Sequence, residues 1–204
     1  SNVILADEIN RTPPKTQSAL LEAMQEGSVT ASGNTYRLPN PFFVLATQNP
    51  IEQEGTYPLP EAQLDRFMFN VWVDYPSYEE ELEIVKKTTS DEVTKLDVIL
   101  TAEQIIAYQD LIRRIPVADN VLEYAVSLVN KTRLKNEKAT ELTKKYITWG
   151  AGPRASQYLV VGAKCYAALR GKYSPDIEDV KAIAKPILRH RLVRNYRADA
   201  EGYS

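Results

Sequence analysis

The first eight residues constrain the fold of this chain more than any other stretch. Four apolar residues, Val3 to Ala6, run directly into two carboxylates, Asp7 and Glu8. Such a run is typical of a buried parallel strand, and open α/β sheets bind their ligands at the carboxyl ends of such strands. The pattern therefore predicts an α/β fold with an acidic ligand site at the end of the first strand. A helix cap at the end of the strand is the alternative use of the same two acids.

An aspartate in this place helps to hold the Mg2+ of a nucleotide in enzymes that carry a phosphate-binding loop, G-x-x-x-x-G-K-[ST], earlier in the chain. Only two residues precede Val3, and the 204 residues contain no such loop. We therefore expect the first half of a nucleotide site to be missing from this sequence. We also expect the 204 residues alone to show no ATP binding below millimolar concentration and no ATPase activity.

Composition excludes several other classes of protein. Hydrophobic residues make up 44% of the chain and charged residues 25%, as in an ordinary globular protein. No apolar stretch approaches the ~18 residues of a membrane span. One cysteine, Cys165, and one histidine, His190, are too few for a disulfide or a His/Cys metal site. We expect a cytoplasmic protein in which any metal is Mg2+ on oxygen ligands, with Cys165 buried and His190 structural or exposed.

The charges are divided unevenly along the chain. Residues 1–130 contain 9 Lys and Arg against 20 Asp and Glu, whereas residues 131–204 contain 16 against 7. This division fits a subunit that meets its own copy head to tail, a basic part that meets an acidic partner such as nucleic acid, or two solvated faces. Composition alone favours the solvated faces.

Apolar runs and turn signals predict three strands and a hairpin in the first third of the chain. A helix with Thr12 as its N-cap is expected to end at Gly27, and the next residues favour a β-hairpin over 28–38. Apolar runs near 42–48 and 68–73 are expected to form the second and third strands, with Asn49 at the end of the second. A hinge at 74–76 divides the chain into domains over residues 1–74 and 75–204.

The second domain is expected to contain helices and no strand. Capping boxes and starting signals predict five helices, and the polar residues 135–147 are expected to form a loop. The helices are expected near 78–89 (opened by Ser77 and Glu80), 102–114 (opened by Thr101 and Gln104), 119–134, 153–169 and 175–184.

Four segments, in this order and spacing, resemble those of AAA+ ATPases. VILADEINR is similar to the Walker B segment, LATQNP to sensor 1, EAQLDRF to the arginine-finger segment and GPRAS to sensor 2. PPKTQSALLEAMQEG and NPIEQEGTYPLPEAQLDRF are closer still to the MoxR branch. The likeness covers nearly the whole chain. It implies an α/β fold, a partial AAA+ P-loop core with three core strands and a hairpin, followed by an all-helical lid domain.

The resemblance also implies roles for five residues. Asp7 would bind Mg2+ through water, and Glu8 would be the general base for the attacking water. Asn49 would reach the γ-phosphate or that water. Arg66 would be the arginine finger that a neighbouring subunit offers to the transition state. Arg154 matches sensor 2, which in this branch is expected to serve a neighbouring subunit's nucleotide.

Local chemistry offers another interpretation for several of these residues. An asparagine before proline, such as Asn49, is commonly a turn residue. Arg66 is open to a local ion pair with Asp65 or Glu61. Arg154 lies in the first turn of an expected helix, where the helix dipole favours the binding of an anion. This position predicts phosphate binding by Arg154 independently of the family resemblance. A solvated arginine is the alternative.

The resemblance implies an ATP-hydrolysing, ring-forming, chaperone-like protein that remodels or matures client proteins with ATP and Mg2+. Its implied partners are copies of itself, expected to form a hexamer, von Willebrand A-type domain proteins and protein clients, whereas nucleic acid is not expected. The hairpin over 28–38 resembles the pre-sensor-1 hairpin, which contacts substrate or the central pore in relatives, and a plain surface hairpin is the alternative. Rival functions are the ATPase subunit of a metal chelatase, a DNA-remodelling ATPase and a non-catalytic interaction module.

Overall fold

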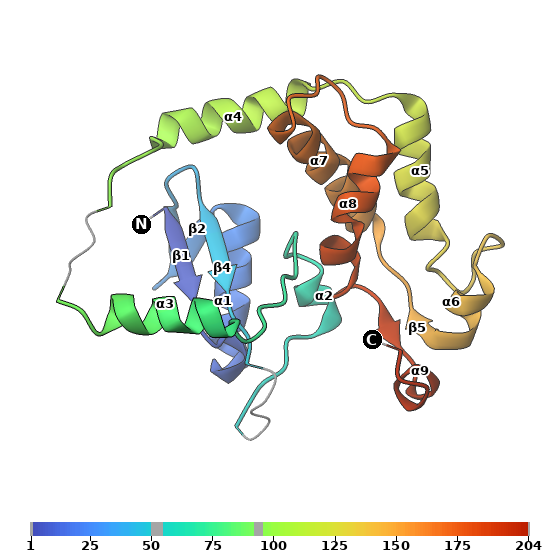
Figure 1. The fold of residues 1–204 in the computed structure, drawn as a ribbon, viewed down its shortest axis with the longest axis horizontal. Coiled ribbons are helices and arrows are strands. Elements are labelled where there is room, and N and C mark those ends of the chain that lie inside the picture. The colour runs from blue at the N-terminus through green and yellow to red at the C-terminus, as the bar shows by residue number, and fades with distance from the viewer. Residues whose placement is uncertain (1, 50–54, 92–95, 204) are drawn as a thin grey trace.

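The computed structural model describes residues 2–49, 55–91 and 96–203, which form a small α/β part followed by a helical part (Figure 1). The elements of the α/β part are β1 (Val3–Ala6), the 3-10 helix η1 (Ile9–Arg11), α1 (Pro14–Glu26), β2 (Ser28–Ala31), β3 (Asn34–Arg37), β4 (Phe43–Ala46) and α2 (Glu61–Leu64). Those that follow are α3 (Tyr78–Thr88), α4 (Ala102–Arg114), α5 (Asp119–Asn130), α6 (Glu141–Tyr146), β5 (Ile147–Trp149), α7 (Pro153–Leu169), α8 (Ile177–Leu188), β6 (Val193–Arg194) and α9 (Tyr196–Ala200).

β1 and β4 pair in parallel, with Val3 opposite Phe43 and Leu5 opposite Leu45. Their carboxyl ends therefore meet at one edge, as the sequence predicts. Val44, between two of these residues, is buried, whereas all four paired side chains are at least half exposed. The prediction of a strand buried on both faces is wrong for β1, because one face of this two-stranded sheet is uncovered by the described residues.

The expected hairpin forms from β2 and β3, which pair antiparallel with Ser28 opposite Arg37. Its two turn residues, Ser32 and Gly33, have φ angles of 51° and 80°. Two successive positive φ angles are what a tight two-residue hairpin turn requires. The turn chemistry in the sequence therefore placed this hairpin correctly.

The expected third strand over 68–73 does not form. Residues 69–77 have no regular secondary structure, and Val71, Trp72 and Val73 are 73%, 73% and 92% exposed. A strand needs a neighbour to pair with its backbone groups, and no described strand pairs with this run. The start of the run is instead held by the helical part, since the N–H of Asn70 donates to the carbonyl of Pro186 at 2.8 Å.

The helix ends follow most of the sequence signals. α1 ends at Gly27, whose φ of 61° suits a glycine, and both capping boxes expected at α3 and α4 form. Thr12 is not the N-cap of α1, because its N–H closes η1 on the carbonyl of Ile9 and Pro13 takes the capping position. α8 begins at Ile177, after its cap Asp176, two residues later than the predicted start at 175.

The main hydrophobic core lies between α5, α7 and α8. Ala125, Ala155, Leu159, Val180 and Ile187 are fully buried there. Three features of the helical part were not predicted: α6 occupies part of the expected loop, α9 forms over Tyr196–Ala200, and β5 pairs antiparallel with β6, so the expectation of a part without strands is wrong. These strands have three and two residues, too few for a periodicity to be seen in the sequence.

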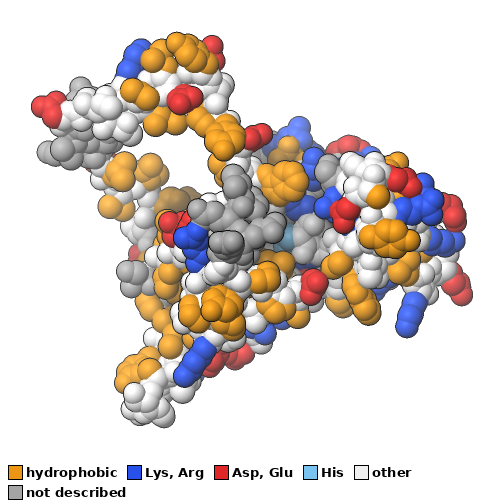
Figure 2. Space-filling view, turned by 90° about the horizontal axis from the view of Figure 1, so that it is seen from below, with side chains coloured by type: hydrophobic (Ala, Val, Ile, Leu, Met, Phe, Trp, Pro, Cys, Tyr) orange, Lys and Arg blue, Asp and Glu red, His pale blue; other side chains and the backbone are white. Residues whose placement is uncertain are grey.

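Charged side chains are unevenly spread over the face of the molecule in Figure 2. In Figure 2, Lys and Arg side chains are concentrated over the right half of the view, mixed there with Asp and Glu, while hydrophobic side chains gather on the projecting left part. Among the helices of the described residues, none is long and apolar enough to cross a membrane.

Substitution of Gly150 tests how closely the backbone is packed in the helical part. A Cβ at this position would lie 2.2 Å from the carbonyl oxygen of Thr132 and 2.9 Å from the Cα of Arg133. Gly150→Ala is therefore expected to lower the free energy of unfolding by about 1–3 kcal/mol, because backbone atoms must move. Gly152→Ala, where no heavy atom lies within 4 Å, is the control, with an expected change below about 1 kcal/mol. Urea unfolding measures the free energy of unfolding of both variants. Equal stability of Gly150→Ala and Gly152→Ala would contradict this packing.

Candidate functional site

The acids predicted from the sequence lie at the carboxyl edge of β1 and β4. The hydroxyl of Thr47 donates to Oδ1 of Asp7 at 2.5 Å and accepts the N–H of Glu8 at 2.8 Å. At the same edge, the side-chain amide of Asn10 donates to the backbone carbonyl of Asn49 at 3.3 Å. The structure thus places Asp7, Glu8 and the backbone of Asn49 at one edge, as parallel strands with adjacent carboxyl ends require.

Glu8 has an unusual backbone conformation. Its φ and ψ are 47° and 53°, a left-handed conformation that is uncommon for any residue other than glycine. Residues held in this way are concentrated at functional sites. The Glu8 side chain makes no capping hydrogen bond to η1, so the helix-cap interpretation does not hold for it. Its carboxylate instead lies 3.3 Å from Arg11 in a half-exposed ion pair of the weak, surface kind.

Thr47 is a site residue that the sequence interpretation missed. It is the first residue after β4, and its single hydroxyl bonds to both consecutive acids. The available signal was its position: a hydroxyl side chain directly after a parallel strand lies beside the residues that follow the neighbouring strand. Thr47 therefore fixes the Asp7 carboxylate and the Glu8 backbone relative to each other.

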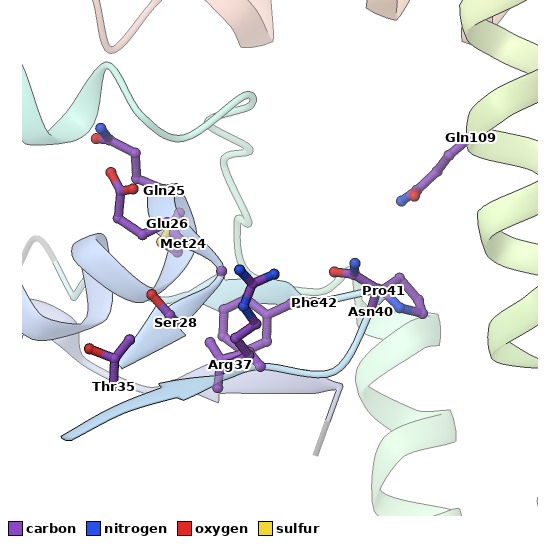
Figure 3. Close-up of a pocket in the computed structure, with 12 residues that line it drawn as sticks. Met24, Gln25, Glu26, Ser28, Thr35, Arg37, Asn40, Pro41, Phe42 and Gln109 are labelled. Atoms are coloured by element: carbon purple, nitrogen blue, oxygen red, sulfur yellow. The ribbon is translucent and has the colours of Figure 1, made fainter. Parts of the chain in front are cut away.

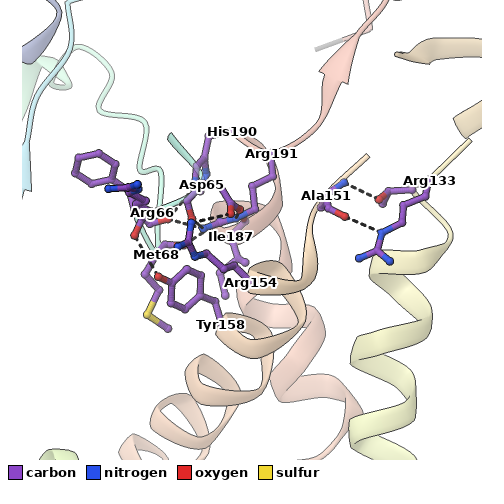
Figure 4. Close-up of polar contacts among 12 residues, drawn as sticks. Asp65, Arg66, Met68, Arg133, Ala151, Arg154, Tyr158, Ile187, His190 and Arg191 are labelled. Carbon is purple, nitrogen blue, oxygen red and sulfur yellow. Dashed lines mark hydrogen bonds and ion pairs between the residues drawn. The ribbon is translucent and has the colours of Figure 1, made fainter. Parts of the chain in front are cut away.

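Arg66 lies at a second place, where the segment after α2 contacts α7 and α8 (Figure 4). The proposed local ion pairs with Asp65 and Glu61 are not made among the described residues. Arg66 Nη1 lies 3.4 Å from the carbonyl of Leu21, and its buried Nε has no hydrogen-bond partner. A guanidinium has five N–H donors, so Arg66 keeps capacity for an anion. It lines a groove of about 300 Å³ beside α1.

Arg154 lies in the first turn of α7, close to the same segment. Its Nη1 is 3.5 Å from Oδ2 of Asp65, and its side chain is 41% exposed. A long, partly exposed ion pair contributes little stability, so an anion of higher charge can displace the Asp65 carboxylate. Arg154 is therefore neither a freely solvated arginine nor a firmly paired one.

The partly exposed Asp65 and the buried Arg191 form an ion pair that the sequence interpretation missed. Arg191 Nε donates to Oδ1 of Asp65 at 2.8 Å, and the Arg191 side chain is 1% exposed. Burial lowers the pKa of Arg191, an effect that its bond to Asp65 opposes. The two residues lie 126 positions apart in the chain, so no local pattern could reveal the pair.

The acidic edge and the two arginines are separate groups in this chain. Within the described residues, neither Arg66 nor Arg154 hydrogen-bonds or ion-pairs with Asp7 or Glu8. Both groups border the small core of Ile9, Leu21 and Leu59: Ile9 follows Glu8, and Phe67, which follows Arg66, packs against this core. One chain therefore presents carboxylates at one place and cations at another.

The acidic edge fits a magnesium nucleotide in part. A carboxylate is an oxygen ligand of the kind that Mg2+ takes in proteins, and Asp7, oriented by Thr47, supplies one. The described residues contain no group of three or more His, Cys, Asp or Glu suited to hold a metal ion. The sequence provides no glycine-rich loop with its lysine for the β-phosphate.

A larger groove lies beside the hairpin. It has a volume of about 620 Å³ and is bordered by the end of α1, by β2 and β3, and by Asn40, Pro41 and Phe42. Figure 3 shows Arg37 and Phe42 in its centre and Gln109 of α4 reaching toward it from the other side. Its lining is mostly polar, and it contains none of the five predicted site residues.

Two family models match the chain. One, described as the ATPase family associated with various cellular activities (AAA), matches residues 1–69, and the other, an AAA lid domain, matches residues 139–203.

Among curated proteins, the chain is 45% identical to the uncharacterized protein YeaC of Bacillus subtilis over 202 residues, which are 98% of this chain and 60% of YeaC. It is 44% identical to chaperone MoxR1 of Mycobacterium tuberculosis over 210 residues, covering 100% of this chain and 54% of MoxR1. A crystal structure of a candidate ATPase from Cytophaga hutchinsonii matches with a TM-score of 0.93 and 44% identity, over 100% of this chain and 62% of that chain. The chain thus spans little more than half the length of these relatives.

His190 makes the junction between the two parts sensitive to pH. Its Nε2 lies 3.0 Å from the carbonyl of Phe67 and must donate, because a carbonyl only accepts, while Nδ1 has no partner. Burial, followed by the charge of Arg191, lowers the pKa of His190 to about 4 from an ordinary 6.5. Between these values the unfolded chain binds more protons than the folded one, so stability should fall as the pH drops from 6.5 to 4.

His190→Gln should flatten this slope, because glutamine keeps a donor for Phe67 without titrating. His190 is the one histidine of the chain, so no other histidine titrates in this window, and the comparison with His190→Gln removes the contribution of the carboxyl groups that both proteins share. Below it both proteins should lose stability alike, since Asp176 and Glu201, whose pKa values are about 2, then become protonated. Urea unfolding from pH 7 to 3 measures the effect, and an unchanged slope between pH 6.5 and 4 would contradict it.

Proposed function

The chain belongs to the MoxR-type family of AAA+ ATPases, and from this premise we propose that its full-length protein hydrolyses ATP as one subunit of a ring. The observation that best supports this is the division of the site: carboxylates at the edge of β1 and β4, and under-used cations at the junction with the helical part. Two such half-sites become one where two subunits meet. The 204 residues contain no phosphate-binding loop, so hydrolysis is assigned to the full-length protein.

The acidic half-site would promote the attack of water on the γ-phosphate. Glu8, held by Thr47 through its backbone N–H, would accept the proton of the water as its oxygen bonds to phosphorus and the bond to ADP breaks. Asp7 would hold Mg2+ through water, and the ion would neutralise charge on the phosphates. Asn49 would orient the attacking water.

The cationic half-site would complete a neighbouring subunit's nucleotide. Arg66 and Arg154 would face the charge that develops on the transferred phosphoryl group. The charge division supports head-to-tail assembly, because the acidic residues 1–130 of one copy would meet the basic residues 131–204 of the next. A closed ring of six copies is the arrangement we propose.

A chaperone-like role in the cytoplasm is the cellular function that we favour. It is supported by the name of the relative MoxR1, a chaperone. Protein clients and von Willebrand A-type domain proteins would be the partners, and the hairpin of β2 and β3 would contact the client or the pore. A metal-chelatase ATPase subunit and a DNA-remodelling ATPase remain the rivals. A decayed, non-catalytic module fits less well, because the Thr47 bonds keep Asp7 and Glu8 in place.

Substitution of the proposed general base tests the chemistry. In the full-length protein, Glu8→Gln should bind ATP and Mg2+ normally but hydrolyse ATP at least ~10-fold more slowly, because proton acceptance is worth ~10²–10⁴ in rate. Glu141→Gln is the matched control, a carboxylate-to-amide change at an exposed ion pair of α6. Steady-state phosphate release and ATP titration measure the two effects. Near-normal turnover by Glu8→Gln would remove Glu8 from the mechanism.

Mixed assemblies test the division between subunits. Arg66→Ala and Glu8→Gln proteins should each be inactive alone, yet a mixture should regain ATPase activity. In some interfaces an intact Glu8 of one subunit then meets an intact Arg66 of its neighbour. Activity is measured against the mixing ratio, with mixed assembly checked by differential tags. Mixed assemblies without activity would show that Arg66 does not act on a neighbouring site.

A further inference from the structure

Arg191 is the most highly bonded side chain of the junction between the two parts. It lies between α8 and β6, and its guanidinium donates to the Asp65 carboxylate at 2.8 Å. It also donates to the backbone carbonyls of Asp65 at 2.9 Å, Phe67 at 2.6 Å and Met68 at 3.3 Å, and to that of Ile187. Four of these five acceptors belong to the segment 65–68, which contains Arg66.

The burial of Arg191 makes these bonds costly to lose. A buried cation is tolerated when it is paired and its donors are satisfied, and removal of one partner leaves an uncompensated charge. The segment 65–68 lies outside any strand or helix, so no regular ladder takes up its carbonyls. A side chain from the other end of the chain therefore specifies the backbone position of the residues around Arg66.

A second contact ties Arg66 to the same helices. The hydroxyl of Tyr158, in α7, donates to the carbonyl of Arg66 at 3.2 Å. The Arg191 guanidinium lies 5.1 Å from the centre of the Tyr158 ring, and Asp65 reaches Arg154 at the start of α7. Arg66 and Arg154 are thus attached to one set of contacts, which Figure 4 shows around Asp65.

We infer that Arg191 is a positioning residue. It fixes the turn that carries Arg66 onto α7 and α8, and α7 carries Arg154. One subunit therefore presents both cations together to the terminal phosphate of its neighbour's nucleotide. The inference rests on the proposed function and adds to it a residue that does not itself touch the nucleotide. Because the acids and the remaining nucleotide contacts belong to the other subunit, loss of Arg191 should lower kcat and leave KM for ATP nearly unchanged.

The test uses mixtures of full-length Glu8→Gln and Arg66→Ala subunits. In these mixtures, active interfaces take their cations from the Glu8→Gln subunits and their acids from the Arg66→Ala subunits. Arg191→Lys, which keeps the charge but not the five bonds, is placed first in the Glu8→Gln subunits. We expect kcat of the mixture to fall about tenfold, the effect of a small misplacement of reacting groups.

The matched control places the same Arg191→Lys change in the Arg66→Ala subunits, where the mixture should keep the kcat of its parent. An equal loss for both placements would mean general damage to the fold, and no loss for either would mean that Arg66 is placed without Arg191. Both results overturn the inference while the proposed function stands. An inactive parent mixture, seen before Arg191 is changed, would instead overturn the proposed function and the inference that rests on it.

Thermal unfolding of each subunit shows whether Arg191→Lys folds. If it does not fold, a milder variant tests whether the contacts of Arg191 and Tyr158 position Arg66. Tyr158→Phe removes one hydroxyl and its bond to the Arg66 carbonyl and leaves the ring beside Arg191. Placed in the Glu8→Gln subunits it should lower kcat about two- to threefold, close to the worth of one hydrogen bond, and it should have no effect in the Arg66→Ala subunits. The same loss in both placements, or none in either, would contradict the inference.

Discussion

The ion pair of the buried Arg191 with the partly exposed Asp65 joins the two parts of this chain. Segment 65–70 has no strand partner among the described residues, and its backbone carbonyls bond to Arg191, His190 and Tyr158. Ion pairs of this kind often contribute little net stability, since well-packed apolar residues can replace them. What this pair provides is a defined position: it fixes where the chain passes from the α/β part into the helices, and with it the location of Arg66.

The position of this junction has a chemical consequence. Arg66 and Arg154 are attached to the helical part, whereas Asp7 and Glu8 are attached to the edge of β1 and β4, where Thr47 orders them. A phosphoryl group needs both sets of charges, one to activate water and the other to stabilise the transition state. Among the described residues the two sets are not paired with each other, so in the assembly that we propose each would be available to a nucleotide between two copies.

The sequence predicted the features that depend on neighbouring residues in the chain. The caps of α3 and α4, the stop at Gly27 and the hairpin turn are local, and each is confirmed. Asp7, Glu8 and Asn49 could be placed together because the carboxyl ends of adjacent parallel strands meet. Each of these predictions needed only a short segment and a rule of backbone geometry.

The features that the sequence did not predict depend on distant partners. Residues 68–73 have the apolar pattern of a strand but no described neighbour to pair with, so the pattern misled. The pairing of Asp65 with Arg191 joins residues too far apart for any local signal, and EAQLDRF suggested only nearby partners for Arg66. Thr47 was missed because its role appears only once β4 lies beside β1.

We propose that the carboxylates and the cations of one chain serve different nucleotides. A structure of the full-length protein, assembled with Mg2+ and a non-hydrolysable ATP analogue, tests it most directly. We expect each terminal phosphate to lie between Asp7 and Glu8 of one subunit and Arg66 and Arg154 of the next, with the Arg191 bonds to segment 65–68 intact. A phosphate bound by Asp7, Arg66 and Arg154 of the same subunit would contradict it.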